Sequence, residues 1–137
     1  MAYRTPWYGS IERQTEDNRD FRRVLFTGPH EQLVLMNLGP GEEIGLEAHR
    51  DVDQFLRIER GSGTFTFGAS AQRTRSVPVR AGDAMLVPAG TWHNVRNTGP
   101  TSLALYTVYS SPEHGPGLVE RVRPLTGHGG EMIGHPA

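Results

Sequence analysis

Short apolar runs, separated by glycine and proline, are the feature that most constrains how this chain can fold. Between residues 21 and 110 no segment keeps the period of a helix, and breaks such as Gly39-Pro40-Gly41 and Gly61-Ser62-Gly63 end the runs after a few residues. Runs of this length fit strands and are too short for helices. The runs are Arg22–Thr27, Gln32–Leu38, Ile44–His49, Gln54–Glu59, Thr64–Phe67, Val77–Val79, Ala84–Val87, Trp92–Asn97 and Leu103–Tyr109. Nine strands at regular spacing predict an all-β sandwich or barrel.

The residue totals exclude several kinds of chemistry. With 137 residues, the chain has the length of one domain. It contains no cysteine, so disulfides, thiolate zinc sites, iron–sulfur clusters and a cysteine nucleophile are excluded. All 14 basic residues are arginine, and without lysine there is no Schiff-base chemistry, no pyridoxal phosphate attachment and no P-loop.

Charge and polarity set expectations about partners and location. The formal net charge of −1 offers no electrostatic footprint for nucleic acid. Residues 3–20 are polar and resemble neither a signal peptide nor a membrane span, so we expect a cytoplasmic protein without a membrane partner. We divide the chain into an N-terminal arm (1–20) with a loop or short helical turn, a β-barrel domain (21–110) and a C-terminal tail (111–137).

The stretch from residue 82 to residue 97 combines a rigid turn with a histidine. Its fixed positions are Gly82, Pro88, Gly90, His93 and Asn97, with the spacing G-x5-P-x-G-x2-H-x3-N. The two glycines can adopt backbone conformations that other residues avoid, and the proline stiffens the turn between two expected strands. This arrangement places an imidazole on a strand directly after a corner, where it can be aimed at a metal ion.

A second group of candidate ligands lies upstream. Glu47 and His49 are two residues apart, so on a strand they point to the same face, and a turn brings Gln54 onto the next strand. Together with His93, these side chains can converge inside a barrel. They would offer a carboxylate oxygen, two imidazole nitrogens and an amide oxygen.

With both patterns, the chain resembles the cupin superfamily over roughly residues 21–110. The second cupin motif is matched in full, and the first, G-x5-H-x-H-x3,4-E-x6-G, is matched in spacing by Gly41, Glu47, His49, Gln54 and Gly61. Glu47 stands where the family has its first histidine, and Gln54 stands where it has glutamate. The resemblance implies the cupin double-stranded β-helix, a jelly-roll barrel, in a small single-domain protein.

The resemblance also implies a metal site made of Glu47, His49, Gln54 and His93. A His-x-His-x4-Gln variant occurs among small cupins, including pectin-degradation cupins, which makes Gln54 a ligand by similarity. The carboxylate has moved from the family's fourth ligand position to the first, which keeps the ligand charge at −1. Two imidazoles and a carboxylate suit one divalent ion of Mn, Fe, Zn, Ni or Co. The alternative is a degenerate site that has lost its metal.

Two classes of function fit these residues. The first is a mononuclear metal enzyme acting on a small oxygen-rich molecule such as a sugar acid or keto acid, with Glu47 and Tyr109 as candidate catalytic residues. Isomerisation or ring opening by a Lewis acid is slightly favoured over dioxygenase chemistry, because Gln54 is a neutral ligand. The second class is a non-catalytic module that binds or senses a small molecule, with a structural metal or none.

Alternation along the expected strands places further residues. Tyr106 and Tyr109 lie on the last strand, where core packing is favoured and at least one can face the cavity. Phe55 and Arg57 are expected on the outer face, where a covered Phe55 favours a homodimer. Glu113, with the adjacent histidine, follows the last strand, where it could approach a cavity mouth, but a role as a loop cap is favoured. The expected cavity-lining residues are Val34, Met36, Leu56, Ile58, Met85, Leu105 and Tyr109.

Overall fold

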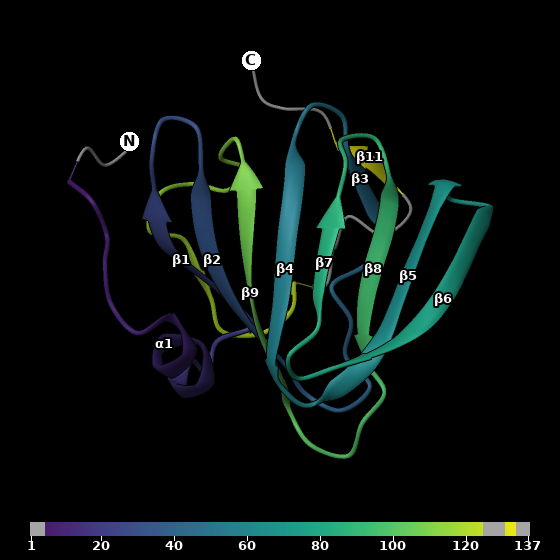
Figure 1. Ribbon diagram of the computed structural model, residues 1–137, viewed down its shortest axis with the longest axis horizontal. Coiled ribbons are helices and arrows are strands. Elements are labelled where there is room, and N and C mark those ends of the chain that lie inside the picture. Colours follow the sequence, from purple (N-terminus) through teal and green to yellow (C-terminus); the bar gives the residue numbers. More distant parts are fainter. Residues whose placement is uncertain (1–4, 125–130, 134–137) are drawn as a thin grey trace.

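The computed structural model describes residues 5–124 and 131–133, which form two facing β-sheets and one short helix (Figure 1). The elements in chain order are α1 (Ile11–Asp17), β1 (Arg22–Thr27), β2 (Gln32–Leu38), β3 (Glu47–His49), β4 (Asp53–Arg60), β5 (Ser62–Ser70), β6 (Arg73–Arg80), β7 (Ala84–Val87), β8 (Trp92–Asn97), β9 (Leu103–Ser110), β10 (Val119–Glu120) and β11 (Glu131–Ile133).

The strand order shows how the chain closes into a barrel. One sheet has the order β10-β1-β2-β9-β4-β7, and the other has the order β11-β3-β8-β5-β6. Several neighbours are far apart in sequence: β2 pairs with β9, and β3 pairs with β8. These antiparallel pairings between early and late strands are those of a jelly roll. The prediction of an all-β, double-stranded β-helix is confirmed.

The nine expected runs each contain a strand, with some differences in length. The run expected at Ile44–His49 is a strand only from Glu47, whereas the run at Val77–Val79 extends to Arg73–Arg80. The structure also forms β10 and β11 within the segment expected as a tail. β10 pairs with β1, and β11 pairs in parallel with β3. Strands of two or three residues carry no readable alternation, so their pairing is decided by the sheet edges that they meet.

The apolar core lies between the two sheets. In β4 the side chains of Gln54, Leu56 and Ile58 are buried while their neighbours are more exposed, which is the alternation of a strand with one inward face. The seven side chains expected to line a cavity all belong to this buried core. They therefore form the apolar surroundings of the inward polar residues described below.

The helix α1 covers part of the outer face of the six-stranded sheet (Figure 1). Ser10 caps its N-terminus by accepting a hydrogen bond from the backbone N–H of Arg13, and Thr15 is its buried residue. Arg60 donates to the carbonyl of Glu16 at 2.9 Å and ties the helix to β4. The expected helical turn in the arm is thus a seven-residue helix. Among the described residues, no helix has the length and apolar character needed to cross a membrane.

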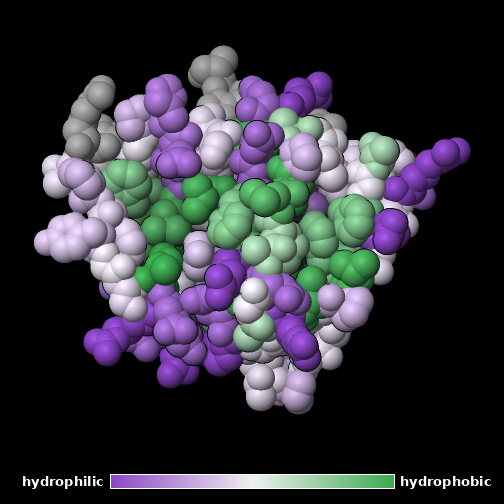
Figure 2. All heavy atoms as spheres, viewed as in Figure 1, coloured by the Kyte–Doolittle hydropathy of each residue, from purple (hydrophilic) through white to green (hydrophobic). Residues whose placement is uncertain are grey.

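Apolar side chains gather on the outer face of the same sheet, across the middle of the view in Figure 2. Phe55 lies opposite Leu86 on one side and Val108 on the other. Its ring is 6.0 Å from that of Tyr106, and Leu86 is 79% exposed. Arg57 shares the outward orientation of Phe55, as the alternation predicted. This outer apolar face is a property of β4, β7 and β9 and is separate from the barrel interior.

Candidate metal centre

The turn before β8 brings His93 next to Glu47 and His49 of β3. Gly90, in this turn, has a φ of 85°, and Gly82, in the turn before β7, has a φ of 96°; both are the left-handed conformations that the sequence motif predicted. The N–H of Gly90 donates to the carbonyl of His49 at 2.7 Å. The turn is therefore bonded directly to the end of β3, and β8 starts beside it with His93 opposite Glu47.

The last fixed position of the spacing pattern, Asn97, lies at the other end of β8. Its side chain is fully buried and donates to the carbonyls of Leu38 at 2.9 Å and Thr101 at 2.8 Å. Its oxygen accepts from the N–H of Gly99 at 2.9 Å. Asn97 thus stabilises the loop between β8 and β9, and it contributes to the site only by holding β8 in place.

Glu47, His49 and His93 form one buried cluster inside the barrel. Their exposed fractions are 4%, 3% and 1%, and one ligand atom from each lies within 4.8 Å of the others. His49 Nε2 is 3.3 Å from Glu47 Oε1, and the two imidazole centroids are 5.5 Å apart. A carboxylate and two imidazoles at this spacing are compatible with a bound divalent metal ion.

Gln54 joins this cluster through His93. The amide oxygen of Gln54 lies 2.9 Å from His93 Nε2, and its amide nitrogen donates to the hydroxyl of Thr107 at 2.9 Å. The other ring nitrogen, His93 Nδ1, lies 2.9 Å from the carbonyl oxygen of Thr91. Both oxygens only accept, and a neutral imidazole carries one N–H. With that proton on Nδ1 and donated to the Thr91 carbonyl, Nε2 presents a lone pair to the oxygen of Gln54.

Two hydrogen-bond acceptors facing each other need a proton or a cation between them. Burial, the largest influence, lowers the pKa of His93 below its ordinary value, even though the Thr91 carbonyl acts in the opposite direction. His93 is therefore neutral at pH 7 and has one N–H for the two oxygens that face its ring, so one ring nitrogen faces its oxygen without a proton between them. A metal ion coordinated by both atoms would satisfy them, so the donor set fits a metal.

The charges of His49 and Glu47 depend on each other. Burial acts to lower the pKa of His49, but the carboxylates of Glu113 and Glu47 outweigh it and raise that pKa to about 9. Burial likewise acts to raise the pKa of Glu47, and the imidazolium beside it holds that pKa below its ordinary value. Within the protein alone, His49 is thus a cation between two anions. A divalent ion can replace the proton of His49.

The two tyrosines of β9 have different surroundings. Tyr109 is buried in the barrel, with its ring edge-on to His49 at a centroid distance of 5.5 Å. Burial raises the pKa of Tyr109 well above its ordinary value, and the charge of Glu47 adds to this effect. Tyr109 is therefore a protonated hydroxyl beside the cluster. Tyr106 lies on the outer face against Phe55 and takes no part in the site.

Sequence reasoning missed two polar residues near the cluster, Gln32 and Thr107, and favoured another role for a third. Glu113, interpreted from sequence as part of a loop cap, has its Oε1 at 3.6 Å from His49 Nδ1. Thr107 bonds Gln54, and Gln32 bonds the backbone of residues 113 and 114. Alternation along β9 does place Thr107 on the face of Tyr109, so that residue had a sequence signal. The position of Glu113 just after the last strand indicated that it could approach a cavity mouth, but outside a strand no alternation predicts that its side chain reaches His49.

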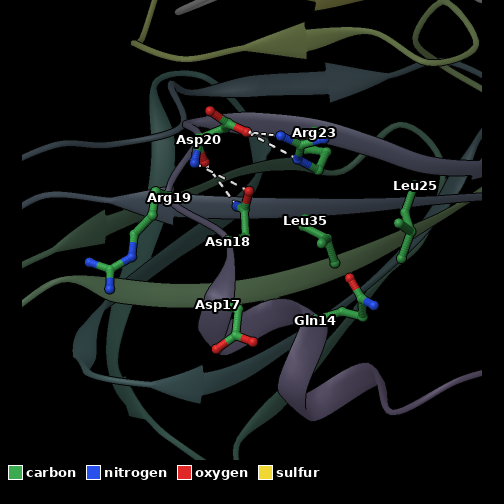
Figure 3. A pocket seen from close by; sticks show the side chains of 8 residues that line it. All are labelled: Gln14, Asp17, Asn18, Arg19, Asp20, Arg23, Leu25 and Leu35. Atoms are coloured by element: carbon green, nitrogen blue, oxygen red, sulfur yellow. Dashed lines mark hydrogen bonds and ion pairs between the residues drawn. The ribbon is translucent and has the colours of Figure 1, made fainter.

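A pocket on the outside of the molecule is not part of this site. It lies beside α1 and the outer face of β1 and β2, and Figure 3 shows its lining side chains. They are Gln14, Asp17, Asn18, Arg19, Asp20, Arg23, Leu25 and Leu35. Two of the charged groups in the lining, Asp20 and Arg23, bond each other at 2.6 Å. The pocket contains none of the four expected metal ligands.

Comparison with known proteins agrees with this fold. A family model described as a cupin domain matches residues 34–109. The Bacillus subtilis protein YrkC is 49% identical over 119 residues, which cover 86% of this chain and 64% of YrkC. An oxalate-binding protein of Thermotoga maritima is 33% identical over 73 residues, 53% of this chain and 56% of that protein. The chain thus spans less than two thirds of each of these two relatives.

A solved structure extends the similarity to three dimensions. The crystal structure of BH2720 from Bacillus halodurans superposes with a TM-score of 0.84 at 46% sequence identity. The alignment covers 86% of this chain and 90% of BH2720. The similarity therefore includes most of both molecules, and the two proteins have the same barrel fold.

Proposed function

Since the chain belongs to the cupin family, we propose that it is a mononuclear divalent-metal enzyme acting on a small oxygen-rich acid. The proposed ligands are Glu47, His49, Gln54 and His93. The observation that carries the proposal is the buried group of Glu47, His49 and His93, whose ligand atoms lie within 4.8 Å of one another. The facing acceptors of His93 and Gln54 support it independently.

The charge of the donor set supports a divalent ion. Glu47 contributes one negative charge, and the two imidazoles and the amide of Gln54 are neutral when they bind a metal. A +2 ion in this set leaves a charge of +1 on the metal and its four ligands, beside the carboxylate of Glu113, and an anionic oxygen of a substrate can bind that ion directly. Imidazole and carboxylate ligands suit Mn, Fe, Zn, Ni or Co.

Each nearby residue has a distinct task in the proposed chemistry. The bound metal would supply Lewis acidity towards a carbonyl or hydroxyl oxygen of the substrate. Tyr109 keeps its proton at neutral pH, so it can donate a hydrogen bond to a substrate oxygen. Glu47 is ionised and is the candidate to accept a proton from the substrate if it leaves the ligand set. The buried apolar core excludes water around these groups and strengthens their electrostatic effects.

The substrate class follows from the site and from relatives. We infer a small carboxylic acid with further oxygens, such as a keto acid or sugar acid, because such a molecule brings a negative charge and metal-binding oxygens. The name of the Thermotoga maritima relative, an oxalate-binding protein, supports a small carboxylate. The neutral ligand Gln54 slightly favours isomerisation or ring opening over reaction with dioxygen.

That relative's name also supports a second candidate function. This relative is 33% identical and is named for binding oxalate. The name favours a non-catalytic module that binds a small carboxylate. In this case the same four residues would hold the metal, and the carboxylate would bind without turnover. The two candidates share the metal site and differ only in whether the ligand is consumed.

Metal analysis tests the shared part of both proposals. Protein purified without chelator should contain about one divalent ion per chain, and His93→Ala should lose it. His30→Ala is the matched control, because His30 is exposed and lies outside the cluster. Wild-type protein without bound metal, and with an unchanged melting temperature on adding Mn, Fe, Zn, Ni or Co, would refute metal binding.

Substrate assays then separate the two candidates. The metal-loaded protein is incubated with oxalate, with 2-keto acids and with uronic acids, and both binding and consumption are measured. Consumption that disappears in His93→Ala supports the enzyme. Saturable binding without consumption supports the binding module.

A further inference from the structure

Gln32, the first residue of β2, holds the segment that follows β9. Its buried side-chain oxygen accepts from the N–H groups of Glu113 at 3.0 Å and His114 at 2.9 Å. Its amide nitrogen donates to the carbonyl of His114 at 2.6 Å and to the hydroxyl of Thr27 at 3.0 Å. Two donors and two acceptor sites are therefore all used. The side-chain amide of Gln32 thus bonds the backbone of residues 113 and 114 much as the backbone of a neighbouring strand would.

The held backbone directs the side chain of Glu113 into the molecule. That side chain is 8% exposed, and its Oε1 has no hydrogen bond within the described part of the chain. It lies 3.6 Å from His49 Nδ1, which has no other hydrogen-bond partner there either. A buried carboxylate is costly unless an N–H group or a cation faces it. His49 is the group that faces this one.

The two nitrogens of His49 are engaged on different sides of the ring. Nδ1 faces Glu113 at 3.6 Å, whereas Nε2 faces Glu47 at 3.3 Å, on the side of the proposed metal. In metal sites the second nitrogen of a histidine ligand usually donates its proton to a carboxylate or carbonyl, which fixes the ring and strengthens it as a ligand. Glu113 has the position of that carboxylate. It is not a member of the group of possible ligands.

We propose that Glu113 is the positioning residue of the metal site: it keeps the proton of His49 on Nδ1 and leaves Nε2 to bind the metal. Gln32, in turn, holds Glu113 in place. The inference rests on the proposed metal binding at Glu47, His49 and His93. It adds a contact from a loop outside both sequence motifs. It also makes the metal affinity of the site depend on Gln32, which contacts none of the proposed metal ligands.

Metal affinity is the direct test. The dissociation constant for Zn²⁺ is measured by competition with a chromophoric chelator for wild type, Glu113→Ala, Glu113→Gln and Gln32→Met. Glu113→Ala should weaken binding roughly 10- to 100-fold, the usual effect of removing such a partner. Glu113→Gln keeps an oxygen acceptor but no charge, so its loss should be smaller. Glu31→Ala, an exposed glutamate in the preceding loop, is the matched control and should bind as wild type does.

A second measurement separates positioning from general damage. Long-range ¹H–¹⁵N spectra of the zinc-loaded wild type should show His49 with a protonated Nδ1 and a zinc-bound Nε2. Zinc bound at Nδ1, or equal zinc affinity in wild type and Glu113→Ala, would overturn the inference and leave the proposed function standing. A wild type that binds no zinc or other divalent metal would instead refute the proposed function, and the inference with it. If Gln32→Met does not fold, the isosteric Glu113→Gln still decides the role of Glu113.

Discussion

The stability of the metal-free protein should fall as pH rises from 6.5 to about 9, because of His49. The ordinary pKa of 6.5 describes this residue in the unfolded chain, and the two carboxylates raise it to about 9 in the fold, against the opposing effect of burial. Below pH 6.5 the imidazole is protonated in both states and its interaction with Glu47 and Glu113 is fully present. Above about 9 it is neutral in both states and this contribution is lost.

The magnitude follows from the difference between the two pKa values. At 1.36 kcal/mol per pKa unit, a rise from 6.5 to about 9 corresponds to about 3 kcal/mol of unfolding free energy. His49 is 3% exposed, so solvent screens this interaction little. Glu47, whose pKa is held below its ordinary value, stays ionised throughout this range and does not change the sign.

Urea unfolding with a chelator present measures the effect. Wild type and His49→Gln are compared at several pH values, since the variant has no titrating group at this position. The difference in unfolding free energy between the two proteins should shrink by about 3 kcal/mol between pH 6.5 and pH 9. A difference that stays constant with pH would refute the raised pKa of His49 and its charge between the two carboxylates.

Three further predictions concern the fold and its surface. Gly61 has a φ of 91°, and a Cβ there would lie 2.7 Å from the carbonyl oxygen of Ser102, whereas Gly82 at 96° has open space around it. Gly61→Ala should therefore lower the unfolding free energy more than Gly82→Ala, whose cost is about 1–2 kcal/mol of backbone strain in urea unfolding. Leu56→Ala should cost about 2–5 kcal/mol by the same measurement, because Leu56 is fully buried in the core. Leu86→Arg should convert the expected homodimer into a monomer in analytical ultracentrifugation, and a wild type that is already monomeric would contradict a dimer at this face.

The local pattern of the sequence was sufficient for the strands and for part of the site. Runs of a few alternating residues identified the strands from Arg22–Thr27 to Leu103–Ser110, because alternation reports which side chains face inward. The motif at residues 82–97 also predicted the left-handed conformations of Gly82 and Gly90, because such a conformation depends on the residue type at a single position. The spacing of Glu47 and His49 placed both on one face of β3, and the structure brings them to His93.

The tertiary structure alone decided which groups complete the site. Glu113 reaches His49 because Gln32, 81 residues away in sequence, binds its backbone, and no local pattern encodes a contact over that separation. The short strand β10 likewise depends on its pairing with the edge strand β1, which no local pattern indicates. The amide nitrogen of Gln54 donates to the hydroxyl of Thr107 on the neighbouring strand β9, and this bond determines where the amide oxygen points. Alternation determines the face on which a side chain lies, and packing between distant segments determines the atom that it meets.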